Sequence, residues 1–162
     1  MMRFLRLSFS RAFIGLIVIM LYSCDPGRVY ESYVEIPEYK WHRENQPEFN
    51  VNIKDTSQAC RILLNIRNSI SYPYKNIYLF LYTQYPDGSL SKDTLEFLFN
   101  NEKGQYLGDC KGDICNNRFV LKENIKFEDA GPYVFRLEHA MRSPDGVLPF
   151  IMNIGFRIER MK

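Results

Sequence analysis

The stretch R-N-S-I-S-Y-P-Y-K-N-I-Y-L-F-L-Y-T-Q-Y-P-D-G, residues 67–88, decides the fold of this chain. It contains the end of an apolar strand, a corner at residues 72–74, an aromatic-rich strand over residues 76–85 and a Pro-Asp-Gly turn. Proline fixes its own φ and keeps the preceding residue extended, so the corner ends the first strand. Strand, corner, strand and turn in such a short stretch are typical of the middle of a β-sandwich.

The rest of the chain repeats this organisation. Apolar residues alternate with polar ones over residues 49–53, 60–66, 133–137 and 148–159, as expected for strands with one buried face. Turn signals separate these segments, and no long segment has the 3.6-residue spacing of an amphipathic helix. The pattern predicts one all-β domain, an antiparallel sandwich of about eight strands. It does not distinguish a jelly-roll from an immunoglobulin-like topology.

The N-terminus has the features of an export signal. Three arginines precede the apolar run 13–22, which is too short to span a membrane because a spanning helix needs about 20 residues. The run ends in Leu21-Tyr22-Ser23-Cys24, which resembles a bacterial lipobox. We therefore expect a cleaved lipoprotein signal at 1–23, a lipidated tether at 24–27 that begins with acylated (palmitate-bearing) Cys24, and the sandwich at 28–162. The expected location is a membrane of the cell envelope. The signal itself does not distinguish the inner from the outer membrane, and our prediction is the outer membrane, facing the periplasm.

The charge of the mature chain excludes one class of partner. The signal carries three arginines and no acids, so its removal leaves 18 basic and 19 acidic residues and a formal charge of −1. A near-neutral domain lacks the basic surface that nucleic acids require, and we expect no nucleic-acid partner.

The cysteines suggest one disulfide. If Cys24 carries lipid, Cys60, Cys110 and Cys115 remain, which allows one intramolecular bridge. Cys110 and Cys115 are close enough in sequence to pair, and closing so short a loop would contribute about 2 kcal/mol. Cys60 lies in an alternating apolar strand and is interpreted as a small buried side chain.

No recognisable site for chemistry follows from the residue pattern. The chain has two histidines, His42 and His139, and the Cys110–Cys115 spacing lacks the second ligand pair of a zinc site, so no metal or cofactor is expected. There is no Gly-x-Ser-x-Gly motif, and the side chains of Glu138 and His139 should point to opposite faces of a strand. A carboxylate pair assembled by folding, as in glycosidases, is an alternative that sequence spacing does not test. We expect no enzymatic activity.

The aromatic residues, 15% of the chain, give two interpretations. Most are expected to fill the core or to form cross-strand pairs. Some could form a binding surface, because tyrosine and tryptophan are enriched at interfaces. The candidates for partner binding are Trp41, Tyr72, Tyr74, Tyr78, Phe80 and Tyr82. An exposed planar row of rings would favour a glycan, and a mixed apolar patch with a polar rim would favour a protein.

Several short motifs, in order and with consistent spacing, carry a family resemblance. They are Cys24-Asp25, residues 28–31 (R-V-Y-E), Ile36-Pro37 with Trp41, Asp55-Thr56, Arg67-Asn68, Tyr72-Pro73-Tyr74 with Asn76, residues 86–88 (P-D-G), residues 93–96 (D-T-L-E), Leu107-Gly108 and residues 140–142 (A-M-R). Together they cover nearly the whole mature domain, and the chain resembles the gliding-motility lipoprotein GldH family of Bacteroidetes. The cysteines at 60, 110 and 115 are not part of the family pattern.

The resemblance implies a cell-envelope lipoprotein of a system that moves surface adhesins and is tied to type IX secretion. It implies no known enzyme activity and no cofactor. The leading hypothesis is a non-enzymatic lipoprotein, anchored in a membrane, that binds other cell-envelope proteins. The alternative is a glycan-binding lipoprotein that uses an aromatic face of its sandwich.

Overall fold

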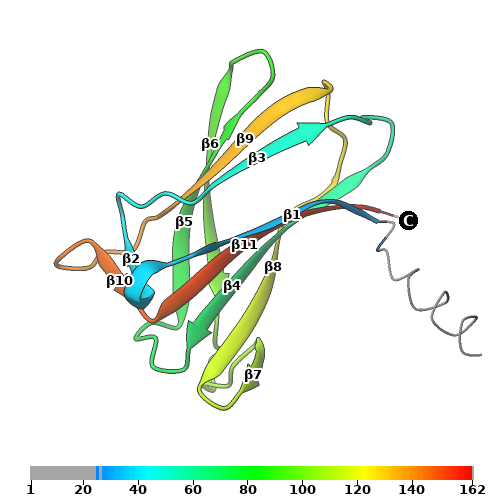
Figure 1. Ribbon diagram of the computed structural model, residues 1–162. Helices are drawn as coiled ribbons and strands as arrows, with labels where there is room; N and C mark the ends of the chain where they lie inside the picture. Colours follow the sequence, from blue (N-terminus) through cyan, green and yellow to red (C-terminus); the bar gives the residue numbers. More distant parts are fainter. Residues whose placement is uncertain (1–24, 26, 162) are drawn as a thin grey trace, which may run out of the picture.

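The computed structural model of the protein describes residues 25 and 27–161. The predicted signal 1–23 and the lipidation residue Cys24 lie outside the described residues. Between Arg28 and Arg160 the chain forms two packed antiparallel sheets and a short ribbon (Figure 1). The all-β antiparallel sandwich predicted from the sequence is confirmed.

The first sheet has the strand order β1-β11-β4-β8-β7, the second sheet has the order β3-β9-β5-β6, and the ribbon pairs β10 with β2. The elements are β1 (Arg28–Glu35), η2 (Pro37–Tyr39), β2 (Lys40–His42), β3 (Glu48–Ile53), β4 (Cys60–Ser69), β5 (Asn76–Gln84), β6 (Leu90–Leu98), β7 (Asp109–Lys111), β8 (Ile114–Ile125), β9 (Gly131–His139), β10 (Val147–Pro149) and β11 (Ile151–Arg160). Only β5–β6 and β7–β8 pair as strands consecutive in the chain; the other pairs join strands separated by other elements. The described residues therefore contain eleven strands, more than the eight predicted.

The extra strands β2, β7 and β10 have three residues each, too few to show a period-2 pattern. Lys40–His42, which pairs with Val147–Pro149, lies in a mainly polar stretch, residues 38–47, whose alternation does not indicate a strand. The expected final strand is interrupted at Phe150, whose φ of 64° lies in the left-handed region. Such a backbone conformation is costly for a residue with a side chain, and it separates β10 from β11.

The stretch 67–88 passes from one sheet to the other. β4 ends in the first sheet, the corner at residues 70–75 crosses the sandwich, and β5 begins in the second sheet (Figure 1). The Tyr72 side chain is buried at this corner, and its hydroxyl donates to the Asn76 carbonyl at 3.1 Å. At the other end of β5, Gly88 adopts a φ of 84° in the turn to β6, a conformation that glycine tolerates without a steric penalty.

Stacked aromatic rings join the two sheets. Phe156 of the first sheet stacks on Phe49 and Phe135 of the second, with ring centroids 5.1 Å and 4.8 Å apart. Phe119 of the first sheet stacks on Phe97 of the second at 4.6 Å. Fully burying a phenylalanine side chain contributes roughly 1.5–3 kcal/mol, which applies to Phe49, Phe135 and Phe156 and only in part to the half-buried Phe97 and Phe119. These contacts are therefore a main source of cohesion between the sheets.

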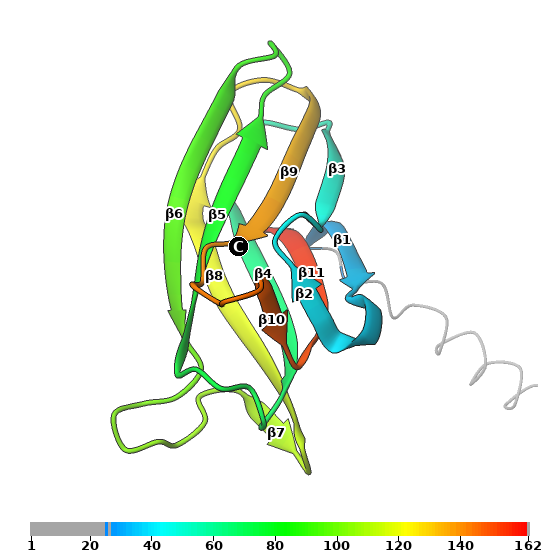
Figure 2. The ribbon, with the colours of Figure 1, turned by 90° about the vertical axis from the view of Figure 1, so that its left-hand side faces the viewer.

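The ribbon closes one end of the sandwich (Figure 2). Trp41 of β2 lies opposite Leu148 of β10, and both side chains are fully buried. The Trp41 indole packs edge-on against the ring of His139 at the end of β9, with centroids 5.4 Å apart. The N-terminal and C-terminal ends of the described chain lie together at the opposite end of the first sheet (Figure 1).

Candidate docking surface

The outer face of β5 is the part of the candidate surface that the structure leaves accessible. Because side chains alternate along a strand, Ile77, Leu79 and Leu81 point into the core and are fully buried. Tyr78, Phe80 and Tyr82 point to the opposite side, which no further layer of described residues covers. We call these three aromatic residues the outer strip. Tyr78 is 40% exposed, and Phe80 and Tyr82 are half-buried.

Two exposed leucines extend the outer strip. In the register of β5 with β6, Gln84 faces Leu90 and Asn76 faces Leu98, so both leucines lie on the same outer face as the aromatic rings. Leu90 is 73% exposed and Leu98 is 51% exposed. Neither leucine is among the partner-binding candidates predicted from the sequence. The signal was present, because even-numbered residues of β6 alternate with the inward-facing Leu95 and Phe97.

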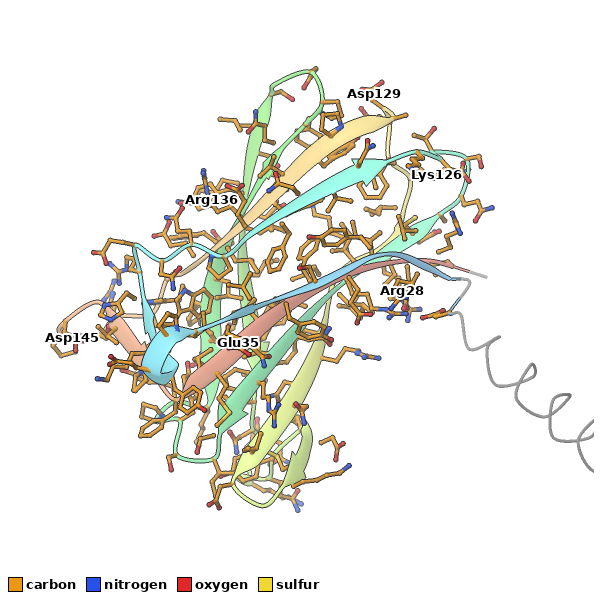
Figure 3. The ribbon with its side chains drawn as sticks, viewed as in Figure 1. Arg28, Glu35, Lys126, Asp129, Arg136 and Asp145 are labelled. Atoms are coloured by element: carbon orange, nitrogen blue, oxygen red, sulfur yellow. A yellow bond between two sulfur atoms is a disulfide. The ribbon has the colours of Figure 1, made fainter. Side chains whose placement is uncertain are left out.

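Cationic side chains from the neighbouring strands cover part of the strip. The Lys92 ammonium of β6 lies 3.6 Å from the centroid of the Phe80 ring and 5.1 Å from that of Tyr82. From β9, the Arg136 guanidinium approaches the Tyr82 ring at 5.5 Å; Figure 3 labels Arg136 on this side of the second sheet. Cation–π contacts at exposed sites contribute about 0.5–1 kcal/mol each.

Hydrogen bonds fix the polar ends of the two tyrosines. The Tyr82 hydroxyl donates to Glu138 Oε2 at 2.9 Å, and Gln46 Nε2 donates to the same oxygen at 3.0 Å. Tyr78 hydrogen-bonds to Glu96, which raises the pKa of its phenol. The strip is therefore an apolar surface inside a rim of charged and amide groups. Strand register positions the charged groups, and Gln46 reaches Glu138 from the loop between β2 and β3.

The rings of the outer strip do not form one plane. Phe80 and Tyr82 have centroids 6.4 Å apart and planes inclined by 65°. One face of the Phe80 ring is already occupied by Lys92. A pyranose ring stacks on a flat, open aromatic face, and this arrangement offers no row of such faces.

The remaining candidates lie at the corner or in the core. Trp41 is fully buried, and its indole N–H donates to the Asn45 carbonyl at 2.7 Å. Tyr72 packs edge-on against Phe99, and Tyr74, which is half-buried, packs on Tyr72. The structure thus removes Trp41 and Tyr72 from the candidate surface, because their large apolar rings close an end and a corner of the core. Tyr74 packs edge-on against the Tyr72 ring at the same corner, with ring centroids 5.6 Å apart.

Cys110 and Cys115 lie opposite each other in the β7–β8 hairpin and are joined by a disulfide. Cys60 is a buried free cysteine. Its pKa is raised by burial, which keeps the thiol protonated and unreactive. None of the described cysteines is therefore placed as a nucleophile.

A cleft of about 330 Å³ lies between the β5–β6 turn and residues 126–129. Its lining combines Tyr85, Phe127 and Tyr133 with Asp87 of the turn and with lysines and acids of residues 122–129. Within the described part of the chain, no group of three or more histidine, cysteine or acidic residues is arranged to hold a metal ion. Residues 25 and 27–161 also contain no helix long and apolar enough to cross a membrane.

Solved structures share the sandwich only distantly. A carbohydrate-binding module of family 28, specific for non-crystalline cellulose, superposes with a TM-score of 0.44 at 10% identity over 80% of this chain and 73% of its own. Dimeric latent PorU from Porphyromonas gingivalis gives a TM-score of 0.35 at 10% identity, over 82% of this chain and 13% of its own. Neither similarity is close enough to carry an argument about function.

Sequence comparison is more informative. The chain is 36% identical over 162 residues to a gliding motility lipoprotein GldH homolog of Christiangramia forsetii, covering 96% of this chain and 98% of the relative. It is 30% identical over 150 residues to the gliding motility lipoprotein GldH of Flavobacterium johnsoniae, covering 90% and 92%. The profile of the GldH lipoprotein family matches residues 28–158, and the chain therefore belongs to this family of membrane-anchored cell-envelope lipoproteins.

Proposed function

We propose that this protein is a non-enzymatic component of an envelope machinery associated with gliding motility and type IX secretion, and that it acts by binding other envelope proteins. The family and the full-length relatives named as gliding motility lipoproteins support the process. In this proposal Cys24 carries the lipid, and the domain lies on the periplasmic face of the outer membrane.

The outer strip is the proposed docking surface, and its composition is the observation that carries the proposal. Three aromatic rings and two exposed leucines lie on one sheet face, surrounded by Lys92, Arg136, Glu138 and Glu96. Apolar centres with polar rims are typical of protein interfaces, and scattered single apolar residues are not. Tyr78, as the most exposed aromatic ring of the strip, is the expected centre of the contact.

Glycan binding is the second candidate, and the geometry of the strip favours it less. The inclined rings of Phe80 and Tyr82 and the position of Lys92 leave little open ring face for a sugar. A protein partner can instead contact ring edges, leucine side chains and the charged rim together.

The test is capture of partners from native membranes through a C-terminal tag, using wild type and a Tyr78→Ser/Leu90→Ser double variant. We expect wild type to recover specific envelope proteins after crosslinking and the double variant to lose most of that recovery. Val120→Ser is the matched control, because Val120 is 46% exposed but lies on the first sheet. Equal recovery by the double variant would contradict the docking surface, and saturable glycan binding without a protein partner would establish the alternative.

Membrane attachment is tested separately. We expect a Cys24→Ala variant to leave the membrane fraction, because one or more acyl chains supply the attachment energy. A variant that stays in the membrane fraction would contradict the proposed lipid anchor.

A further inference from the structure

The segment next to the proposed lipidation site is bound to the folded domain. Arg157 of β11 contacts three carboxylates: Asp25, Glu31 at 3.0 Å and Glu159 at 2.9 Å. The side chains of Arg157, Glu31 and Glu159 are 13%, 18% and 24% exposed, whereas that of Asp25 is 46% exposed, so water screens the Asp25 pair more than the other two. Glu31 and Glu159 belong to strands, whereas Asp25 precedes the first strand. The hydrogen bond to Arg157 lowers the pKa of Asp25, which keeps the carboxylate charged at neutral pH.

Backbone hydrogen bonds fix the same segment. The amide of Gly27 donates to Asp25 Oδ1 at 3.1 Å, and the amide of Arg28 donates to the Asp25 carbonyl at 3.2 Å. The amide of Arg160, at the end of β11, donates to the Gly27 carbonyl at 2.7 Å. The chain is therefore tied to the first sheet from Asp25 onward.

This leaves almost no free tether between the domain and its lipid. Consecutive Cα atoms are 3.80 Å apart, so Cys24 lies one residue from the ion-paired Asp25. A flexible tether of n residues would instead have a typical span of about 5–6 Å times the square root of n.

We propose that the Asp25–Arg157 ion pair holds the acylated N-terminus against the first sheet, so that one end of the domain sits directly on the phospholipid headgroups in a fixed orientation. This inference rests on the proposed lipidation of Cys24. The seating end comprises residues 27–28, 54–59 and 160–161, which are connected by the Arg160–Gly27 hydrogen bond and by the Met161 amide donating to the Ala59 carbonyl at 2.8 Å.

The surface of the seating end suits a headgroup layer. None of the large apolar side chains that are exposed in the described chain falls in residues 27–28, 54–59 or 160–161. Lys54, Asp55 and Ser57 are exposed here instead, and both signs of charge can contact zwitterionic headgroups. This end therefore rests on the membrane without inserting, and the acyl chains alone enter the hydrocarbon layer.

The orientation decides which surfaces face away from the membrane. Arg28 marks the seating end, and Asp145, in the loop between β9 and β10, lies at the opposite end of the molecule (Figure 3). The ribbon of β2 and β10 then projects away from the membrane, and β5 runs along the side of the domain.

The experiment uses the mature, lipidated full-length chain in vesicles of phosphatidylethanolamine and phosphatidylglycerol that carry a paramagnetic headgroup probe. Spin labels are placed at Gln58→Cys, at the seating end, and at Asp145→Cys; Cys60 is buried and Cys110 and Cys115 are bridged, so none of them competes for the label. We expect relaxation enhancement at residue 58 to exceed that at residue 145 severalfold. Equal enhancement at both sites would overturn the proposal.

The Asp25→Asn variant tests the ion pair itself, because it removes the charge of an exposed side chain without touching a strand. We expect the difference in relaxation enhancement between the labels at residues 58 and 145 to fall at least twofold, while the protein stays in the membrane fraction. Glu31→Gln is the matched control, because it removes the charge of another Arg157 partner that does not adjoin the anchor. In this variant the difference in relaxation enhancement between the two labels should persist. An unchanged difference in Asp25→Asn would overturn the role of the ion pair. Failure of lipidation is distinct, since the protein would then be absent from the vesicles.

Discussion

The aromatic residues of this protein fall into two groups with opposite surroundings. The buried group, represented by Trp41 and Tyr72, closes one end and one corner of the core. The outer strip, Tyr78, Phe80 and Tyr82, lies on a sheet face that no described layer covers. Tyr72 and the outer strip come from the same aromatic-rich stretch, residues 67–88, and the difference teaches that residue type alone does not tell a buried ring from an exposed one.

The largest expected effect is on the buried group. Replacing Trp41 with alanine should lower the free energy of unfolding by about 3–5 kcal/mol, because it leaves a cavity between the ribbon and His139. Urea denaturation followed by circular dichroism measures this change. Tyr78→Ala is the comparison variant and should cost much less, since Tyr78 is 40% exposed. Similar losses for both variants would remove the distinction between the groups.

A smaller effect within the buried group isolates one hydrogen bond. Tyr72→Phe keeps the ring contacts with Phe99 but removes the hydroxyl that donates to the Asn76 carbonyl. We expect a loss of about 0.5–1.5 kcal/mol in the same denaturation measurement. The burial that raises the pKa of Tyr72 is consistent with a hydroxyl that stays protonated in this bond. An unchanged stability would show that the corner is held by packing alone.

On the outer strip, Lys92→Met tests the cation–π contact with Phe80. Methionine keeps much of the apolar chain of lysine and removes the charge 3.6 Å from the ring centroid. We therefore expect the free energy of unfolding, measured by urea denaturation, to fall by about 0.5–1 kcal/mol. Lys103→Met, in the exposed loop after β6, is the control for the general loss of a positive charge. Equal effects of the two substitutions would assign no specific role to Lys92.

Acid should lower the stability of the folded protein gradually through His139, which packs against Trp41 of the buried group. Burial, and the nearby positive charge of Arg43, lower the pKa of His139 below 6.5, although Glu138 acts in the opposite direction. The unfolded chain therefore binds more protons between the two pKa values, and the stability present above about pH 6.5 is lost as the pH falls through the folded pKa. Melting temperatures measured across this range should fall more in wild type than in His139→Gln. His42→Gln, at an exposed position, should retain the wild-type slope.

Much of the fold could be predicted from local sequence. The alternation in β4, β5 and β9 gave their inward faces correctly, and the proline corner and Pro-Asp-Gly turn mark the ends of β5. The short strands β2, β7 and β10 could not be predicted, because three paired residues leave no periodicity to detect. The single strand β8 continues to Ile125 although Lys122, Glu123 and Asn124 interrupt its apolar residues. A register shift opposite Ile62 and Leu63 disturbs the alternation there.

The candidate surface was predictable only in part. Period-2 alternation placed Tyr78, Phe80 and Tyr82 on one face of β5, but it did not say whether another layer covers that face. The register of β5 with β6, which local sequence does not give, places Leu90 and Leu98 on the same face as the outer strip. The ion pair of Asp25 with Arg157 connects residues separated by most of the chain, and no local sequence pattern pairs them.

The sequence by itself determined the all-β class, the inward faces of the main strands and the membership of the GldH lipoprotein family, because these depend on local periodicity and on motifs in fixed order. The tertiary structure decided which aromatic rings are buried, which leucines lie beside the outer strip and where the N-terminal segment is held. These properties depend on strand register and on contacts between distant segments, which are set by how the two sheets pack against each other.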